Sequence, residues 1–195
     1  MTDTASRALL PEGLHDTLAP NAGAEWRVVS SLLGRFNLYG YEQVAPPLAE
    51  FEDTLLAGVG AAEGPRMFRM MDPASKRMLG IRTDITTQVA RIATTRLADA
   101  PRPLRLCYAG QVLRVEGGQL RREREVGQAG VELIGEASSA AEVEVLALAS
   151  ERLGFAGFDA PFDDHGRFGC AYSWLKMSRS AQPAMSSSAR VGRNS

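Results

Sequence analysis

The stretch YAGQVLRVEGGQLRREREVGQAGVELIG, Tyr108 to Gly135, decides the fold of this chain. Apolar residues alternate with polar ones on both sides of a Gly-Gly pair and of a dense block of Arg and Glu. Alternation with a period of two is typical of strands, and Gly117-Gly118 favours a connection between them. The pattern therefore predicts a hairpin made of LRLCYAGQVLRV and REVGQAGVELIG.

The segment before this hairpin predicts a helix and a shorter hairpin. Apolar residues recur at spacings of three and four over 22–38, which indicates a helix with one apolar stripe. The stripe consists of Trp26, Val29, Leu33 and Phe36. In the extended run YEQVAPPLAEF, Pro46-Pro47 excludes a central strand and favours an edge or an interface. RMFRMMD and RMLGIR flank PASK and predict the shorter hairpin.

The segment TDITTQVARIATTRL predicts a second helix. Thr83 or Asp84 can cap its start, since short polar side chains accept hydrogen bonds from the first backbone N–H groups of a helix. Its apolar face consists of Ile85, Val89 and Ile92. Hairpins with helices between them indicate the α+β class, with an antiparallel sheet flanked by helices.

The last part of the chain predicts one more helix and then a tail. SSAAEVEVLALASERLG contains an S-x-x-E capping box, Ser139 and Glu142, and Gly154 is its expected stop. Residues 161–195 have no sustained period and drift into Ser and Arg. We expect a folded core over 1–160 that stops mid-domain, followed by a disordered or out-of-frame tail over 161–195, as a frameshift would produce. A natural disordered tail is the alternative.

Composition restricts the class of protein. The chain has 195 residues, 45% of them hydrophobic, and a formal net charge of −1, so neither nucleic acid nor an anionic membrane is an expected partner. No apolar run approaches the ~20 residues that span a bilayer. Two cysteines and two histidines make a metal site unexpected. The sequence indicates a cytoplasmic protein.

Charged and polar residues of the main hairpin predict a binding patch. Arg114 and Glu116 are two residues apart, and Gln128 and Glu132 are four residues apart. Side chains at even spacings along a strand point to the same side, so each pair is expected to share a sheet face. Asp84, at the start of a helix, could add a second carboxylate. Such a set suits a small zwitterion, because Arg binds carboxylates and carboxylates bind ammonium groups. The alternative is a solvated sheet face.

The same stretch resembles motif 2 of class II aminoacyl-tRNA synthetases in its histidyl form. The matching positions are Tyr108, Gly110, Arg114, Glu116, Arg122, Arg124, Gln128, Gly130 and Glu132. GYEQVAPPLAEF resembles motif 1, which builds the dimer interface of that family, and LPEGLHDTLAP resembles its N-terminal opening. The resemblance covers about residues 9–160. It implies a class II synthetase-like catalytic core that is incomplete here.

Departures from the synthetase pattern indicate a branch without catalysis. Asp84 stands where synthetases carry Glu, and Val126 stands where they carry the Phe that stacks on adenine. Loss of an aromatic platform removes ~0.5–1.5 kcal/mol beyond burial. The nucleotide half of the site has thus decayed while the amino-acid half persists. This pattern resembles the histidyl-synthetase-like regulatory subunits of ATP phosphoribosyltransferase.

That resemblance implies a subunit with no catalytic residue, no cofactor and no tRNA charging. A short catalytic subunit would require it for the first step of histidine biosynthesis. It would bind L-histidine and form a homodimer through the motif 1 region. The implied histidine-binding residues are Asp84, Ile85, Thr86, Arg114, Gln128 and Glu132. The implied vestigial phosphate loop consists of Glu116, Arg122 and Arg124.

Two alternatives stay open. The first is a fragment of a histidyl-tRNA synthetase, which would charge tRNA in an ATP-dependent reaction and would be recognised by motif 3 and a tRNA-binding domain. The second is an interaction domain with no ligand, which a calorimetric titration with histidine would distinguish from both others.

Overall fold

The computed structural model describes residues 10–117 and 122–155. The described part contains two three-stranded sheets, with strand orders β1-β5-β6 and β2-β4-β3. In chain order the elements are α1 (Asn21–Leu38), β1 (Glu42–Gln43), β2 (Ala49–Phe51), α2 (Glu52–Leu55), a 3-10 helix (Gly58–Arg66), β3 (Arg69–Met71), β4 (Met78–Ile81), α3 (Thr86–Thr95), β5 (Leu104–Leu113), β6 (Glu125–Ile134) and α4 (Ser139–Phe155). The expected tail over 161–195 lies outside the described residues.

The main hairpin is the frame of the fold, as the sequence predicted. β5 and β6 pair antiparallel over ten residue pairs, from Leu104 opposite Ile134 to Leu113 opposite Glu125. β1 pairs with β5 in the parallel direction, so the larger sheet has one parallel edge. Residues directly opposite each other in an antiparallel pair point to the same face. The even-numbered residues of both strands therefore share one face, and the odd-numbered residues share the other.

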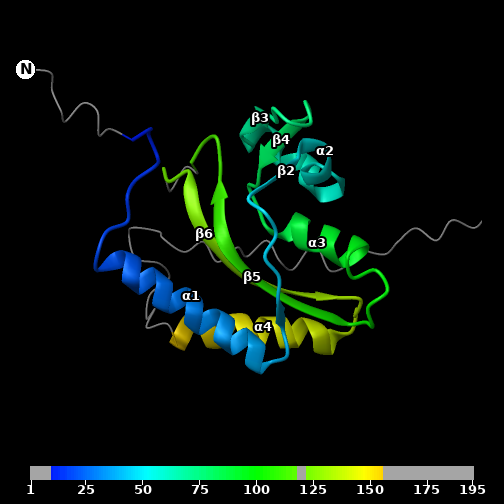
Figure 1. The fold of residues 1–195 in the computed structure, drawn as a ribbon. Coiled ribbons are helices and arrows are strands. Elements are labelled where there is room, and N and C mark those ends of the chain that lie inside the picture. The colour runs from blue at the N-terminus through cyan, green and yellow to red at the C-terminus, as the bar shows by residue number, and fades with distance from the viewer. Residues whose placement is uncertain (1–9, 118–121, 156–195) are drawn as a thin grey trace, which may run out of the picture.

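Helices cover the two faces of this sheet separately. Figure 1 shows α3 on one side of β5 and β6, and α1 with α4 on the other. On the α3 side, the buried apolar cluster consists of Ile85, Val89, Ala93, Leu104, Leu106, Tyr108 and Val112. On the opposite side, it consists of Phe36, Tyr41, Cys107, Val131 and Leu148. The alternation of side chains along the hairpin thus builds two cores from one pair of strands.

The apolar stripe of α1 is only partly buried within one copy of the chain. Phe36 is buried and Leu33 packs beside it, whereas the Trp26 side chain is 73% exposed. Leu48, which follows the Pro46-Pro47 pair, is 50% exposed. Pro46 and Pro47 lie between β1 and β2 and belong to neither strand, so the predicted exclusion of a central strand at the prolines is confirmed. The exposed end of the stripe leaves apolar surface free for another contact.

The helix α4 differs from its predicted ends. The side chain that accepts a hydrogen bond at its start is Ser138, whose Oγ accepts from Ala141 N at 3.4 Å. The predicted capping box of Ser139 and Glu142 is therefore wrong by one residue. Gly154 does not stop the helix, which continues to Phe155. A single glycine costs a helix only ~1 kcal/mol, which packing of the helix on a sheet can offset.

An ion pair holds α4 to the sheet. The guanidinium of Arg105 on β5 donates two hydrogen bonds of 2.9 Å to the two carboxylate oxygens of Glu144. The Tyr41 hydroxyl donates to the same carboxylate at 3.0 Å. Arg105 lowers the pKa of Glu144, and burial together with the Glu144 contact raises the pKa of Tyr41. The Glu144 carboxylate therefore joins α4 to β5 and to the segment between α1 and β1.

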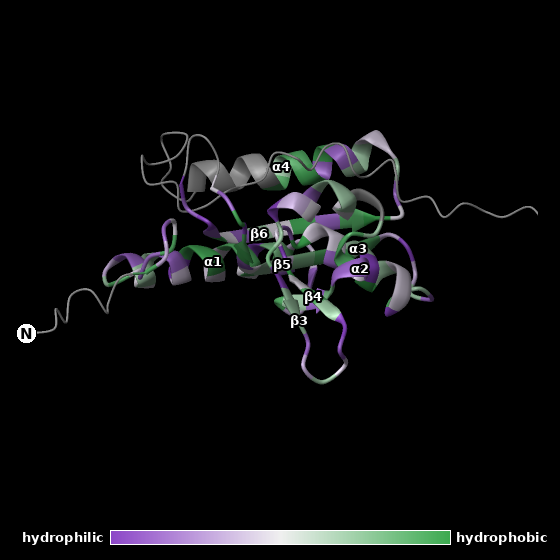
Figure 2. Ribbon diagram, turned by 90° about the horizontal axis from the view of Figure 1, so that it is seen from above, coloured by the Kyte–Doolittle hydropathy of each residue, from purple (hydrophilic) through white to green (hydrophobic). Residues whose placement is uncertain are grey.

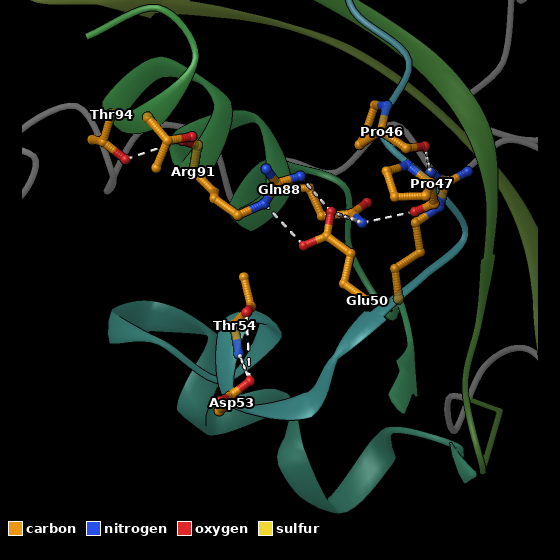
Figure 3. A network of polar contacts seen from close by, with 10 residues as sticks. Pro46, Pro47, Glu50, Asp53, Thr54, Gln88, Arg91 and Thr94 are labelled. Carbon is orange, nitrogen blue, oxygen red and sulfur yellow. Dashed lines mark hydrogen bonds and ion pairs between the residues drawn. The ribbon is translucent and has the colours of Figure 1, made fainter. Parts of the chain in front are cut away.

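The smaller sheet is joined to α3 by a second buried carboxylate, Glu50 of β2. Figure 3 shows Glu50 between Arg91 and Gln88 of α3. Arg91 binds both oxygens of Glu50, with its Nε 2.9 Å from Oε2. The Gln88 amide donates to Glu50 Oε1 at 2.9 Å and to the backbone oxygen of Pro47 at 2.8 Å. The network fixes α3 against the proline segment.

The predicted shorter hairpin is formed by β3 and β4, which pair antiparallel, and its turn projects away from the larger sheet (Figure 2).

Replacing Glu50 with Ala should destabilise the protein by about 2–4 kcal/mol, because the partners of a largely buried carboxylate lose their acceptor. The Glu50 side chain is only 8% exposed. The control is Asp53→Ala, which breaks the Arg77–Asp53 pair, where the Asp53 side chain is 72% exposed. That change should cost no more than about 1 kcal/mol. Urea unfolding measures both, and equal midpoints would contradict the role given to Glu50.

Candidate functional site

An amide and a carboxylate meet above the main hairpin, where α3 begins. Gln128 of β6 is buried, and its Oε1 accepts a hydrogen bond from Ile85 N at 2.9 Å. Its Nε2 donates to Asp84 Oδ2 at 3.0 Å, and Asp84 Oδ1 accepts from Thr86 N at 2.7 Å. The helix α3 thus begins at Thr86, two residues after the predicted cap, but Asp84 does hold its first turn. Four of the predicted binding residues therefore lie together: Asp84, Ile85, Thr86 and Gln128.

Glu132 joins this cluster from four residues further along β6. Its Oε1 is buried and has no hydrogen-bond partner. Burial is the main cause that raises the pKa of Glu132 to about 8; a hydrogen bond from the Thr86 hydroxyl acts against it, and the Asp84 carboxylate acts with it. The Thr86 hydroxyl also lies 3.1 Å from the Tyr108 hydroxyl. Because the folded chain holds this proton more tightly than the unfolded chain, stability present at acidic pH is lost as the pH rises through about 8.

Arg114 lies on the same face of the hairpin but does not contact the cluster. It follows the end of β5, where its backbone N–H donates to Arg124 O at 2.8 Å. Its position is four residues beyond that of Gly110, the partner of Gln128. At about 3.3 Å per residue, the two backbone positions are roughly 13 Å apart. Arg114 Nε is buried without a hydrogen-bond partner, so this donor is available to a ligand that spans the gap.

The predicted phosphate-loop residues are not gathered into one cationic site. Glu116 and Arg122 are exposed, and Glu116 lies past the end of β5, so the prediction that it shares a strand face with Arg114 is wrong. Arg124 is occupied within the chain: its backbone N–H donates to Gly13 O at 2.8 Å, and its Nη1 donates to Glu12 O at 3.1 Å. Its guanidinium also lies 4.9 Å from the centre of the Phe68 ring.

Val126 and its surroundings offer little to a nucleotide. The Val126 side chain packs against the apolar cluster under α3. Val126 also borders an open concavity of about 550 Å³, and the acidic residues that line it are Glu25, Glu123 and Glu125. Among the described residues, no Lys or Arg lines this concavity. Phosphate groups are stabilised by cations and N–H donors, so a surface with three carboxylates does not suit them.

The residue that the sequence interpretation missed is Arg82. It is 7% exposed, and its guanidinium donates to Gln111 O at 2.8 Å and to Pro46 O at 2.9 Å. A Cβ atom at Gly110 would lie 2.3 Å from Arg82 Nη2, so only glycine leaves room for this crossing. A glycine inside a strand often marks close approach of another group. Gly110 was therefore the sequence signal that could have revealed the close contact of Arg82 with β5.

The described part of the chain lacks a metal site and a membrane-spanning helix. It contains no group of three or more His, Cys, Asp or Glu residues arranged to hold a metal ion. Within the same residues, no helix is long and apolar enough to cross a membrane.

Known proteins resemble this chain in sequence. A regulatory subunit of ATP phosphoribosyltransferase from Paramagnetospirillum magneticum is 57% identical over 153 residues, which is 78% of this chain and 40% of that protein. The protein of the same name from Gluconobacter oxydans is 48% identical over 158 residues, 81% of this chain and 42% of that protein. The chain therefore spans about two fifths of the length of these relatives.

Solved structures resemble the fold. An ATP phosphoribosyltransferase regulatory subunit/histidyl-tRNA synthetase from Bacillus halodurans matches with a TM-score of 0.67 and 30% identity, over 77% of this chain and 38% of that one. Apo histidyl-tRNA synthetase from S. aureus matches with a TM-score of 0.60 and 25% identity, over 75% of this chain and 34% of that one. The family model described as histidyl-tRNA synthetase matches residues 13–168. The two sheets, the site above the main hairpin and this match lead to one conclusion: the chain belongs to the histidyl-tRNA synthetase family.

Proposed function

We propose that this chain is the histidine-binding part of a regulatory subunit that activates ATP phosphoribosyltransferase in the cytoplasm. The names of the relatives at 48–57% identity support the regulatory role. The observation that carries the proposal is the division of the site. The amino-acid half keeps two carboxyl groups, an amide and the free Arg114 Nε donor, whereas the nucleotide half has Val126 packed in the core and Arg124 bound to backbone oxygens.

The ligand of the proposed site is L-histidine. Asp84 and Glu132 offer acceptors for an ammonium group and an imidazole ring, with Ile85 and Thr86 as the backbone that Gln128 and Asp84 hold in place. Arg114 would reach the carboxylate from the far end of the same face. The ammonium group of the ligand would thus meet a carboxyl group, and its carboxylate would meet the unpartnered Nε donor of Arg114. Each charge of the zwitterion would have a partner of opposite kind, which is the condition for a buried charge to be stabilised.

A reconstituted assay tests the proposed role. The purified chain should raise phosphoribosyl transfer by a short catalytic subunit that is inactive alone, because the relatives are named as regulatory subunits of that enzyme. In parallel, histidine-dependent ATP–pyrophosphate exchange should be absent, since misplacement of a nucleotide by about 1 Å can cost ~100-fold. Measurable exchange would favour the alternative, a fragment of a histidyl-tRNA synthetase.

Substitutions in the site should separate binding residues from the proposed vestigial loop. Glu132→Ala or Arg114→Ala should weaken histidine binding at least ~30-fold, because loss of one partner from a desolvated polar pair costs ~2–5 kcal/mol. The control is Arg122→Ala, which removes an exposed charge and should change affinity little. Calorimetric titration measures all three variants. A damaging Arg122→Ala together with a silent Glu132→Ala would contradict the assignment.

The exposed apolar end of α1 supports the proposal of a homodimer through residues 26–51. Trp26→Glu should convert the dimer to a monomer, because it places a charge in the proposed two-fold interface, where each residue occurs twice. Val143→Glu is the control, since Val143 is 63% exposed on α4, outside that region. Sedimentation velocity distinguishes the two states. A monomeric unsubstituted protein, or equal effects of both substitutions, would count against this interface.

A further inference from the structure

Arg82 lies at the point where the proline segment meets the end of β5. Its guanidinium joins the two, since Nη1 donates to Pro46 O at 2.9 Å and Nε donates to Gln111 O at 2.8 Å. Its backbone repeats the link, because the N–H donates to Leu48 O and the carbonyl oxygen accepts from Leu113 N, both at 3.0 Å. Four hydrogen bonds therefore fix Arg82 against two segments that are distant from it in sequence.

The residues that Arg82 joins lead directly to the two charged ends of the proposed site. Asp84 is two residues after Arg82, and Arg114 directly follows Leu113. Gln128 holds the Asp84 end from β6. Arg82 holds the last residues of β5, and so the start of Arg114, against the same turn that carries Asp84.

We propose that Arg82 is a positioning residue that fixes Arg114 relative to Asp84, so that both charged groups of one zwitterion can be bound at once. This role of Arg82 rests on the proposed function, which takes Arg114 as the partner of the ligand's carboxylate. Groups that bind a ligand together must be held close to the required geometry by supporting hydrogen bonds. The hydrogen bonds of Arg82 supply such support at the far end of the site.

The chemistry of Arg82 suits support better than contact with a ligand. Nε and Nη1 already bind backbone oxygens, and no carboxylate of the described residues forms an ion pair with this guanidinium. Burial lowers the pKa of Arg82, and the Glu50 carboxylate acts against this shift. A buried cation without an ion pair is costly, so an apolar side chain would serve better if packing alone mattered. A planar guanidinium, however, offers donors in several fixed directions.

Gly110 provides the space that the Arg82 side chain occupies. A Cβ atom at this position would lie 2.3 Å from Arg82 Nη2 and 3.3 Å from Arg82 Cζ. Alanine at position 110 would therefore displace the guanidinium and leave the arginine itself unchanged. The chain thus offers two independent ways to break the same contact.

Calorimetric titration with L-histidine and with histamine, which lacks the carboxylate, tests the inference. Arg82→Lys keeps the charge but cannot donate in both directions, and Gly110→Ala keeps the arginine but moves it. Each should weaken histidine binding at least ~10-fold, the lower end for one charge-assisted hydrogen bond, and histamine binding less than about twofold. The double variant should match either single variant, because both remove one contact. The control is Gly23→Ala, whose Cβ atom would lie 3.4 Å from Arg27 Nη1; it should change neither affinity.

The ratio of the two affinities separates positioning from loss of fold, because a smaller folded fraction lowers both affinities alike. Equal losses for histidine and histamine, or no loss for either, would overturn the inference and leave the proposed function standing. If histamine binds too weakly to measure, the Arg114→Ala background decides: Arg82→Lys should cost no further histidine affinity there, and a full additional loss overturns the role. If Arg82→Lys does not fold, Gly110→Ala decides by the same measurements. A chain that binds no histidine overturns the proposed function, and the role of Arg82 falls with it.

Discussion

The side-chain amide of Gln128 is the interaction on which the site depends. Its two ends hold Ile85 N and the Asp84 carboxylate, so one group on β6 fixes both the first turn of α3 and the position of an acid. A buried amide with both ends hydrogen-bonded is rigid, because loss of either bond leaves a polar atom unsatisfied. The distance between the start of α3 and the sheet is therefore set by these hydrogen bonds as well as by the apolar cluster below them.

Much of the fold could be predicted from local sequence because local rules decide it. The period-two pattern located β5 and β6, and the stripe of α1 located that helix to within one residue. The errors have physical causes. Ser138 and Ser139 are adjacent and chemically equal, so only geometry selects the cap. Gly154 lies inside α4 because one glycine is a weak stop when other residues of the helix pack on a sheet.

Part of the candidate cluster could be predicted from the sequence, but the contacts within it could not. Asp84, Gln128 and Glu132 lie together as expected, yet Gln128 was expected to contact ligand and is found bound to the backbone and to Asp84. Contacts between residues distant in sequence determine such roles. Arg82 is the clearest case, because its partners at Pro46 and Gln111 belong to segments that come together only in the folded chain.

Backbone oxygens of the chain itself compete with anions for the guanidinium of Arg124. Its guanidinium donates to the backbone oxygens of Glu12 and Arg114, and its backbone N–H donates to Gly13 O. Gly13 lies so close that a Cβ atom there would be 2.7 Å from the Arg124 side chain. An anion that captured this guanidinium would have to displace the N-terminal segment. Binding of an anion to Arg124 would then increase protease cleavage or amide exchange around residues 12 and 13.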